Sequence, residues 1–265
     1  MNEIPLEFYV SPINKQPLIL KSETILTDED GNEFHKNIEN GFWNFVPEYS
    51  PLYSKEECDQ WKKVIDNFLV SFEEDPEHNV SYAERDDALA FGEFCNYHGM
   101  VLDLGCGPHK VPSYLKYRRN PDADHYGLDP VIGEQPREYK FVQGVGEHVP
   151  FKEGLFDVTI YATSLLHFLD PRVGIKEALR VTKPDGYLSV WVGEKTKQEI
   201  EQPVVSNQWY DDLEVPEGAE NPFHFKRFGA DDFEGYINDC NLKIIEKEET
   251  EIEGWGKNIF YKVVH

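Results

Sequence analysis

The stretch that decides the fold is Val101–Pro108, which reads VLDLGCGP. Its mainly apolar start predicts a buried strand, and the two glycines that follow let the backbone turn sharply and approach a ligand at the carboxyl edge of a sheet. Asp129 lies 22 residues beyond Gly107, at the end of the next expected strand, where a carboxylate can hold a ribose diol. Together these features predict a nucleoside-binding site where the strand order of the sheet reverses.

Short apolar runs alternate with helical stretches over the rest of the chain. This alternation predicts an α/β fold, with a Rossmann-like, seven-stranded, mostly parallel sheet and helices on both faces. Lys183–Gly186 reads as a turn before the fifth strand, and a last helix is expected at about residues 230–240. The expected strands are residues 100–104, 125–128, 140–143, 156–162, 187–192, 242–247 and 258–264.

The sequence of the glycine loop distinguishes between two candidate cofactors. A dinucleotide fingerprint, G-x-G-x-x-G, needs a third glycine, but Gly107 is followed by residues 108–111 (PHKV), with no glycine at that spacing. Asp103, two residues before the first glycine, can accept a hydrogen bond from the ammonium group of an amino-acid moiety. The loop therefore favours S-adenosylmethionine over a nicotinamide dinucleotide.

Residues from about 80 to 265 resemble the class I S-adenosylmethionine-dependent methyltransferases, and within them the large group (methyltransferase type 11-like) that acts on small molecules and glycans. The similar segments, in chain order, are residues 103–108 (DLGCGP), Asp129, 144–151 (GVGEHVPF), 156–171, 183–188 and 225–245. The resemblance implies that the cofactor is bound by Asp103, Gly105, Cys106, Gly107, Asp129, Pro130, Val145, Gly146, Glu147 and Ala162.

One position departs from that family pattern. Val145 stands where the family usually carries the aspartate that binds the adenine amino group. The resemblance then leaves that contact to the backbone, to Glu147 or to water.

Methyl transfer to a hydroxyl needs a general base, and two histidines are candidates for this catalytic role. His167 follows the fourth expected strand, at the edge where the methyl group should lie, and imidazole titrates near neutral pH. His224 lies in the long polar stretch 194–228, which we expect to form a substrate cap. A local hydrogen bond, without a role in catalysis, is the alternative for either histidine.

Residues 1–50 are expected to form a small antiparallel β module. They resemble, more weakly, the zinc ribbon that precedes the catalytic domain in some methyltransferases, including a group that acts on ribosomal RNA guanine. Residues 11–14 and 27–31 occupy the positions of its thiolate pairs but contain no cysteine, so we expect no metal there. We expect hydrogen bonds to hold this zinc-ribbon-like module instead, with an aromatic core of Phe34, Phe42, Trp43 and Phe45. A substrate-recognition or dimer surface and a purely structural role both stay open.

Residues 51–99 are expected to be a helical connector that covers the cofactor, followed by the methyltransferase domain over residues 100–265. Its first helix is indicated by apolar residues at helical spacing, and a second helix is expected from Tyr82 toward Tyr97. The spaced apolar residues are Trp61, Val64, Ile65, Phe68 and Leu69.

Charge and composition limit the class of partner. The 265 residues carry a formal charge of −24, which disfavours nucleic acid and anionic membranes, and an apolar content of 40% is enough for a core. We find no apolar run long enough to span a membrane, no signal-like N-terminus and no paired cysteine motif among the four cysteines. We therefore expect a cytoplasmic protein that acts on a small molecule or glycan, with a homodimer as a candidate assembly.

Three functions remain after these observations. The favoured one is a methyltransferase that acts on a hydroxyl, or less readily on an amine or carboxyl, of a small molecule or glycan. The second is a regulatory module that binds the cofactor without catalysis, which Val145 and the single histidine of the His167-Phe168 pair suggest. The third, an RNA methyltransferase, conflicts with the charge, since residues 194–265 hold 17 acidic residues against 8 basic ones.

Overall fold

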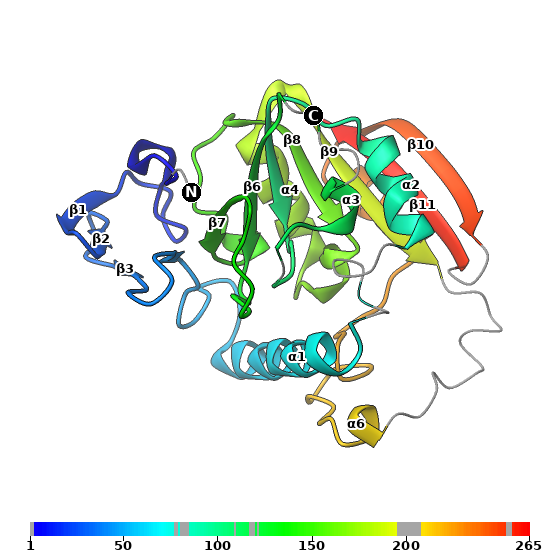
Figure 1. Cartoon of the computed structure of the whole chain (residues 1–265), viewed down its shortest axis with the longest axis horizontal. Coiled ribbons are helices and arrows are strands. Elements are labelled where there is room, and N and C mark those ends of the chain that lie inside the picture. The colour runs from blue at the N-terminus through cyan, green and yellow to red at the C-terminus, as the bar shows by residue number, and fades with distance from the viewer. Residues whose placement is uncertain are drawn as a thin grey trace.

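The computed structural model describes residues 3–76, 79, 85–108, 110–116, 120, 122–194, 208–252 and 256–265. A single sheet runs through these residues in the order β1-β2-β3-β4-β7-β6-β5-β8-β9-β11-β10 (Figure 1). Its strands are β1 (Ile19–Ser22), β2 (Ile25–Thr27), β3 (Glu33–Lys36), β4 (Trp43–Asn44), β5 (Met100–Leu104), β6 (Asp124–Asp129), β7 (Lys140–Gln143), β8 (Phe156–Ala162), β9 (Thr182–Glu194), β10 (Lys243–Ile252) and β11 (Gly256–Val264).

The helices lie mainly between strands along the chain. They are α1 (Lys55–Glu74), α2 (Asp86–Cys95), α3 (Ser113–Lys116), α4 (Pro171–Val181), α6 (Gln208–Asp211) and α7 (Ala230–Asp239), with the 3₁₀ turns η1 (Leu6–Phe8), η2 (Gly146–His148) and η3 (Ser164–His167).

The central strands confirm the expected α/β fold. From β7 through β6, β5 and β8 to β9 the neighbours are parallel, and β11 then pairs antiparallel with both β9 and β10. The chain moves outward from β5 to β6 and β7 and then returns to place β8 on the other side of β5. The strand order therefore reverses at the carboxyl end of β5, where the glycine loop begins.

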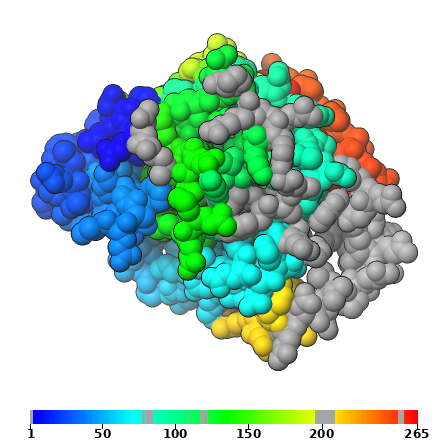
Figure 2. Space-filling model, in the orientation of Figure 1, coloured from blue at the N-terminus to red at the C-terminus, as the bar shows by residue number. Residues whose placement is uncertain are grey.

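The expected count of seven strands is wrong for the sheet as a whole. Strands β5 to β11 correspond to the seven predicted strands, but β4 pairs parallel with β7 and carries β1, β2 and β3 onto the same sheet. The N-terminal strands are therefore an extension of the central sheet. The blue N-terminal residues form one continuous surface with the rest of the molecule (Figure 2).

Alternate residues of β5 enter two hydrophobic clusters on opposite faces of the sheet. Val101 packs with Phe91 of α2 and Tyr114 of α3, whereas Leu102 belongs to the larger cluster that contains Ile175 of α4 and Phe233 of α7. This alternation follows from the two-residue period of a strand. Helices therefore cover both faces, as the sequence predicts.

Two local predictions need correction. Lys183–Gly186 is part of β9 instead of a turn before it, because β9 pairs with β8 at Thr182 and again at Tyr187, so that the intervening residues bulge. The second helix begins at Asp86, and the predicted start at Tyr82 lies outside the described residues.

Helix α1 crosses beneath the end of the sheet at which the parallel strands finish (Figure 1). It begins at a capping box, in which the Ser54 hydroxyl accepts from the Glu57 backbone N–H and the Glu57 carboxylate accepts from the Ser54 N–H. Cys58 and Val64 are buried, which fixes the rotation of the helix about its axis. A second face is left to line the site described below.

Candidate functional site

A cavity of about 260 Å³ lies at the carboxyl ends of the central strands. Eight of the ten residues predicted to bind the cofactor line it; Asp103 and Cys106, which are both fully buried, are not among the lining residues. The eight are Gly105, Gly107, Asp129, Pro130, Val145, Gly146, Glu147 and Ala162.

The first glycine of the loop is required by its surroundings. Gly105 has a φ of +77°, a conformation that L side chains rarely adopt, and its N–H donates to the Leu128 carbonyl at 2.7 Å. A Cβ on Gly105 would lie 2.4 Å from the Cβ of Ser164. Only glycine therefore lets the loop turn here and leave the cavity open.

Asp129 is held at the end of β6 by two backbone donors. Its Oδ2 accepts from the Gly107 N–H and its Oδ1 accepts from the Val131 N–H, both at 2.8 Å. Burial raises the pKa of this carboxyl, and the two donors oppose that rise. Each oxygen keeps a second lone pair, which is what a ribose diol would use.

Among the described residues, the carboxyl of Asp103 has one oxygen with a hydrogen-bond partner and one without. The Tyr114 hydroxyl donates to Oδ2 at 2.7 Å, while Oδ1 is buried and has no hydrogen-bond partner within the described part of the chain. Burial raises the pKa of Asp103 to about 7. A buried acceptor without a donor is costly, and the ammonium of a bound amino-acid moiety would satisfy it.

Arg137 is a residue that the sequence analysis missed. Its buried guanidinium donates to the Gly107 carbonyl at 2.6 Å and to the carbonyls of Val131 and Ile132 at 2.9 Å, and it stacks 3.7 Å from the ring centre of Phe141. It thereby joins the glycine loop to the loop after β6. Arg137 lies outside every motif, so nothing in the sequence marked it.

Glu147 is, with Asp129, one of the two acidic residues among the described residues that line the cavity. Its Oε1 accepts from the Leu169 N–H at 3.0 Å, and burial raises the pKa of its carboxyl to about 7. The side chain also lines a smaller neighbouring hollow beside Tyr53 and Cys58. Glu147 therefore offers the cavity a carboxyl group that changes protonation near neutral pH.

The two candidate histidines lie together although they are far apart in the chain. Their ring centres are 4.7 Å apart, and His167 lines the cavity whereas His224 is not among the lining residues. Nδ1 of His167 lies 3.2 Å from the Phe223 carbonyl oxygen, and Nδ1 of His224 lies 2.8 Å from Oδ1 of Asn221. Because a carbonyl can only accept, Nδ1 of a neutral His167 carries the proton and its Nε2 keeps a lone pair.

The protonation state of His167 follows from its burial. Burial lowers the pKa of this imidazole to about 4, with a smaller contribution from the charge of Arg227. The ring is therefore neutral at physiological pH. A neutral imidazole with an available lone pair can accept a proton, which is the property that the proposed base needs.

Helix α1 supplies the other wall of the cavity. Trp61, Ile65, Phe68 and Phe72 line it, and the Trp61 indole N–H donates to the His167 carbonyl at 3.3 Å.

The described part of the expected substrate cap contacts helix α1 instead of lining the cavity. None of its described residues (194 and 208–228) lines the cavity, and they reach α1 through Asn67, whose amide donates to the carbonyls of Glu214 and Pro222, each at 2.9 Å.

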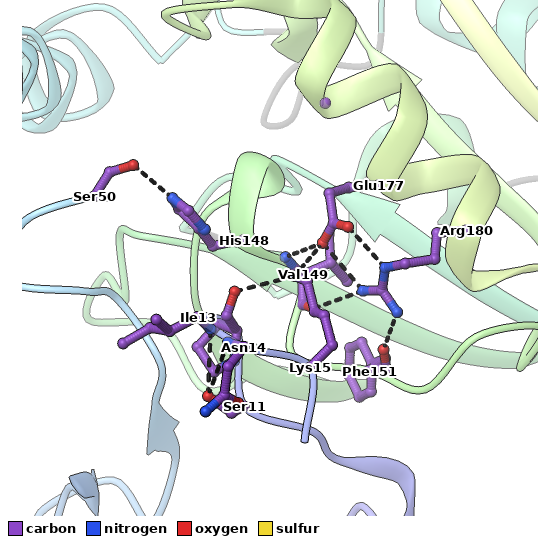
Figure 3. A network of polar contacts seen from close by, with 12 residues as sticks. Ser11, Ile13, Asn14, Lys15, Ser50, His148, Val149, Phe151, Glu177 and Arg180 are labelled. Carbon is purple, nitrogen blue, oxygen red and sulfur yellow. Dashed lines mark hydrogen bonds and ion pairs between the residues drawn. The ribbon is translucent and has the colours of Figure 1, made fainter. Parts of the chain in front are cut away.

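The N-terminal module is joined to residues 144–151, which follow β7 and include three of the residues predicted to bind the cofactor, by a network of ion pairs and hydrogen bonds (Figure 3). These residues are named the cofactor loop. Nζ of Lys15 lies 2.6 Å from Oε2 of Glu177 on α4, and the same carboxylate accepts from the Val149 N–H at 3.0 Å. Arg180 pairs with Glu177 at 2.7 Å and donates to the carbonyls of Val149 and Phe151.

A second contact joins the module to the same loop. The Ser50 hydroxyl lies 2.7 Å from Nε2 of His148, which directly follows the cavity residue Glu147 (Figure 3). On the other side of the loop, the Val10 N–H donates to the Pro150 carbonyl at 3.0 Å. The loop that supplies Val145, Gly146 and Glu147 to the cavity is therefore held from the N-terminal side.

Residues 11–14 and 27–31 are joined by hydrogen bonds, as predicted. The Ser11 hydroxyl donates to Asp28 and the Asn14 amide donates to Asp30, each at 2.7 Å. Among the described residues, no group of three potential ligands is placed to hold a metal ion, and the four cysteines are free thiols. Phe34, Trp43 and Phe45 are buried, while Phe42 packs edge-on against Phe141 at 4.9 Å.

Comparisons with known proteins agree with this geometry. Residues 102–190 match a family described as a methyltransferase domain. An uncharacterised methyltransferase of Schizosaccharomyces pombe is 28% identical over 109 residues, and the uncharacterised protein YafE of Escherichia coli is 27% identical over 119 residues. The matches cover 33% and 43% of this chain and 37% and 53% of the two relatives.

One solved structure is similar in fold to nearly the whole chain. It is the 1,6-didemethyltoxoflavin N1-methyltransferase of Burkholderia thailandensis, which is 12% identical, has a TM-score of 0.55 and covers 93% of this chain and 97% of that one. In the described residues, no helix is long and apolar enough to cross a bilayer. The segment that matches the methyltransferase domain, residues 102–190, thus contains the cavity-lining residues at the ends of β5 to β8.

Proposed function

We propose that the protein transfers the methyl group of S-adenosylmethionine to a hydroxyl, or less readily to an amine or carboxyl, of a small molecule. The observation that carries this proposal is that His167, the candidate base, lines the same cavity as eight of the residues expected to bind the cofactor. The structure of the Burkholderia thailandensis relative, which contains S-adenosylhomocysteine, supports the choice of cofactor.

The residues of the chain divide the binding of the cofactor between them. Asp103 would pair with the ammonium group, Asp129 would bind the ribose hydroxyls, and Val145 and Gly146 would lie against the adenine. When bound, S-adenosylmethionine supplies a methyl group activated by the positive charge on sulfur. The protein then needs to align the acceptor and take its proton.

His167 is the residue that we propose as the base. As the acceptor oxygen or nitrogen bonds to the methyl carbon, the carbon–sulfur bond breaks and its electron pair stays on sulfur. The acceptor proton passes to Nε2 of His167. His224 would act as a positioning residue, since its ring contacts that of His167 at 4.7 Å between ring centres.

The first test separates catalysis from binding. Calorimetry should show S-adenosylhomocysteine binding to the full chain, and isotope-labelled S-adenosylmethionine should donate its methyl group to one member of a panel of small hydroxylated compounds. Replacing His167 with Gln should lower turnover about 10²- to 10⁴-fold, the usual contribution of a general base, and leave cofactor affinity within about twofold.

The control is His35→Gln, because the side chain of His35 is exposed on β3. That variant should retain full turnover. Binding of S-adenosylhomocysteine with no methyl transfer to any compound would favour the inactive regulatory module. Full turnover by the His167→Gln variant would remove His167 from the mechanism.

A further inference from the structure

Helix α1 presents a stripe of half-buried apolar side chains to the cavity. Trp61, Ile65, Phe68 and Phe72 recur at intervals of four, three and four residues, which places them on one face of the helix. Val64, on the adjoining face, is completely buried against the protein. The stripe therefore borders the cavity over three turns of the helix.

Aromatic rings surround the cavity end of this stripe. The ring of Phe68 stands edge-on to His167 at 4.2 Å and lies 5.2 Å from Phe223. Phe168 also lines the cavity, and a Cβ on Gly146 or on Gly174 would come within 2.4 Å of its ring. Both glycines therefore make room for this ring, which lies next to the proposed base in sequence.

The charged side chains that line the cavity are acidic. Of the described lining residues, Asp129 and Glu147 are acids and none is a lysine or arginine. Arg227 is close enough to lower the pKa of His167, but the residue is exposed and its backbone N–H donates to Glu220. An anionic acceptor would therefore meet acidic carboxyl groups in the cavity and no lining cation.

We propose that the α1 stripe and the rings of Phe68, Phe168 and His167 form the acceptor site, and that this site takes a planar, uncharged aromatic or heteroaromatic molecule with a ring hydroxyl or ring N–H. This inference rests on the proposed methyl transfer. Stacked and edge-on ring contacts stabilise a flat acceptor. A sugar would place its hydroxyl groups against the apolar stripe, where they would find no hydrogen-bond partners.

The low basicity of His167 also favours an aromatic acceptor. An imidazole whose pKa is lowered to about 4 is a weak base, so it is matched to an acceptor that releases its proton readily. A phenolic hydroxyl, with a pKa near 10, is such a group, and an aliphatic hydroxyl is a much weaker acid. The Burkholderia thailandensis relative was solved with 1,6-didemethyltoxoflavin, the acceptor in its name.

The test is calorimetric titration of the full chain, saturated with S-adenosylhomocysteine, with three probes. They are 2-naphthol, its anionic analogue 6-hydroxy-2-naphthoate, and methyl β-glucopyranoside. We expect 2-naphthol to bind at least tenfold more tightly than either of the others. Equal or tighter binding of the glucoside or of the naphthoate would overturn the proposal.

Variants of α1 locate the binding. Phe68→Ala should weaken 2-naphthol at least tenfold while the affinity for S-adenosylhomocysteine changes less than twofold, which also shows that the variant is folded. Leu69→Ala, on the same helix but 38% exposed and off the stripe, is the matched control and should bind both ligands normally. Phe72→Leu provides a second variant if Phe68→Ala does not fold.

The outcomes distinguish this inference from the proposed function. Normal binding of S-adenosylhomocysteine with unchanged binding of 2-naphthol to Phe68→Ala contradicts the aromatic acceptor site alone. A wild-type chain that binds 2-naphthol through Phe68 but does not bind S-adenosylhomocysteine contradicts methyl transfer and leaves the aromatic site in place.

Discussion

At the scale of single residues, the buried carboxyl of Asp103 should make cofactor binding depend on pH. Burial raises its pKa to about 7 in the unliganded protein, and only the ionised form pairs with an ammonium group. Below pH 7 the dissociation constant of S-adenosylmethionine should therefore rise, approaching tenfold per pH unit, while above pH 7 Asp103 contributes no further change. Titration calorimetry between pH 5.5 and 8 measures this dependence.

Two variants assign the titration to one of the two carboxyls that share this pKa. Asp103→Asn should bind the cofactor weakly and with little change between pH 5.5 and 7, because no ionised partner remains for the ammonium. Glu147→Gln should keep the dependence of the wild type. If Glu147→Gln removes the dependence and Asp103→Asn keeps it, Glu147 is the group that titrates.

The residues of the site were predictable where chemistry fixes their type and spacing. The glycine loop and Asp129 were visible because a tight turn and a ribose-binding carboxylate need those residues in that order. His167 and His224 were named separately, but their contact depends on tertiary structure, since Phe223, whose carbonyl Nδ1 of His167 reaches, is 56 positions further along the chain. Arg137 was missed because a guanidinium that binds carbonyl groups needs no motif.

At the scale of secondary structure, the ion pair between Lys15 and Glu177 joins two elements that no sequence pattern connects. Replacing Lys15 with Met keeps the aliphatic stem and removes the charge that meets Glu177. Since the lysine side chain is one-third exposed, we expect the free energy of unfolding to fall by only about 1–2 kcal/mol. Because Glu177 also binds the Val149 N–H, cofactor affinity should fall about threefold to tenfold.

The matched control for this prediction is Lys21→Met. Lys21 pairs with Glu33 within the N-terminal strands, but its side chain is 57% exposed and the pair lies away from the cofactor loop. The free energy of unfolding in urea and the affinity for S-adenosylhomocysteine measured by calorimetry should both be close to those of the wild type. Equal effects of the two substitutions would mean that the loss of a surface charge, and not the contact with Glu177, is responsible.

Elements were predictable to the extent that their own sequence carries the signal. The helical spacing of Trp61, Val64, Ile65 and Phe68 correctly placed α1, yet it could not tell which of these side chains face a cavity and which face the core. The pairing of β4 with β7 was missed for a similar reason. A two-residue strand carries almost no periodicity, and its partner lies about 100 residues away.

At the scale of the whole molecule, the N-terminal module and the catalytic part share one core. Phe45 is completely buried, and the ring of Tyr9 lies 5.0 Å from Phe45 and 5.5 Å from Phe151, which belongs to the cofactor loop. Tyr9 and Phe151 also form an isolated antiparallel bridge. The module therefore buries its aromatic residues against the methyltransferase domain as well as within itself, and we expect the two to unfold together.

The corresponding prediction is that Phe45→Ala destabilises the entire chain. Removing a buried phenylalanine leaves a cavity and should lower the free energy of unfolding by about 3–5 kcal/mol. Because the core is shared, the far-ultraviolet circular dichroism of the sheet and the binding of S-adenosylhomocysteine should be lost together, in one transition at a lower denaturant concentration. Ile38→Ala, in the same module but 89% exposed, should leave that transition in place. The contrary result is two separate transitions. If Phe45→Ala shifts only one of them, and cofactor binding is intact after that transition, the module folds on its own.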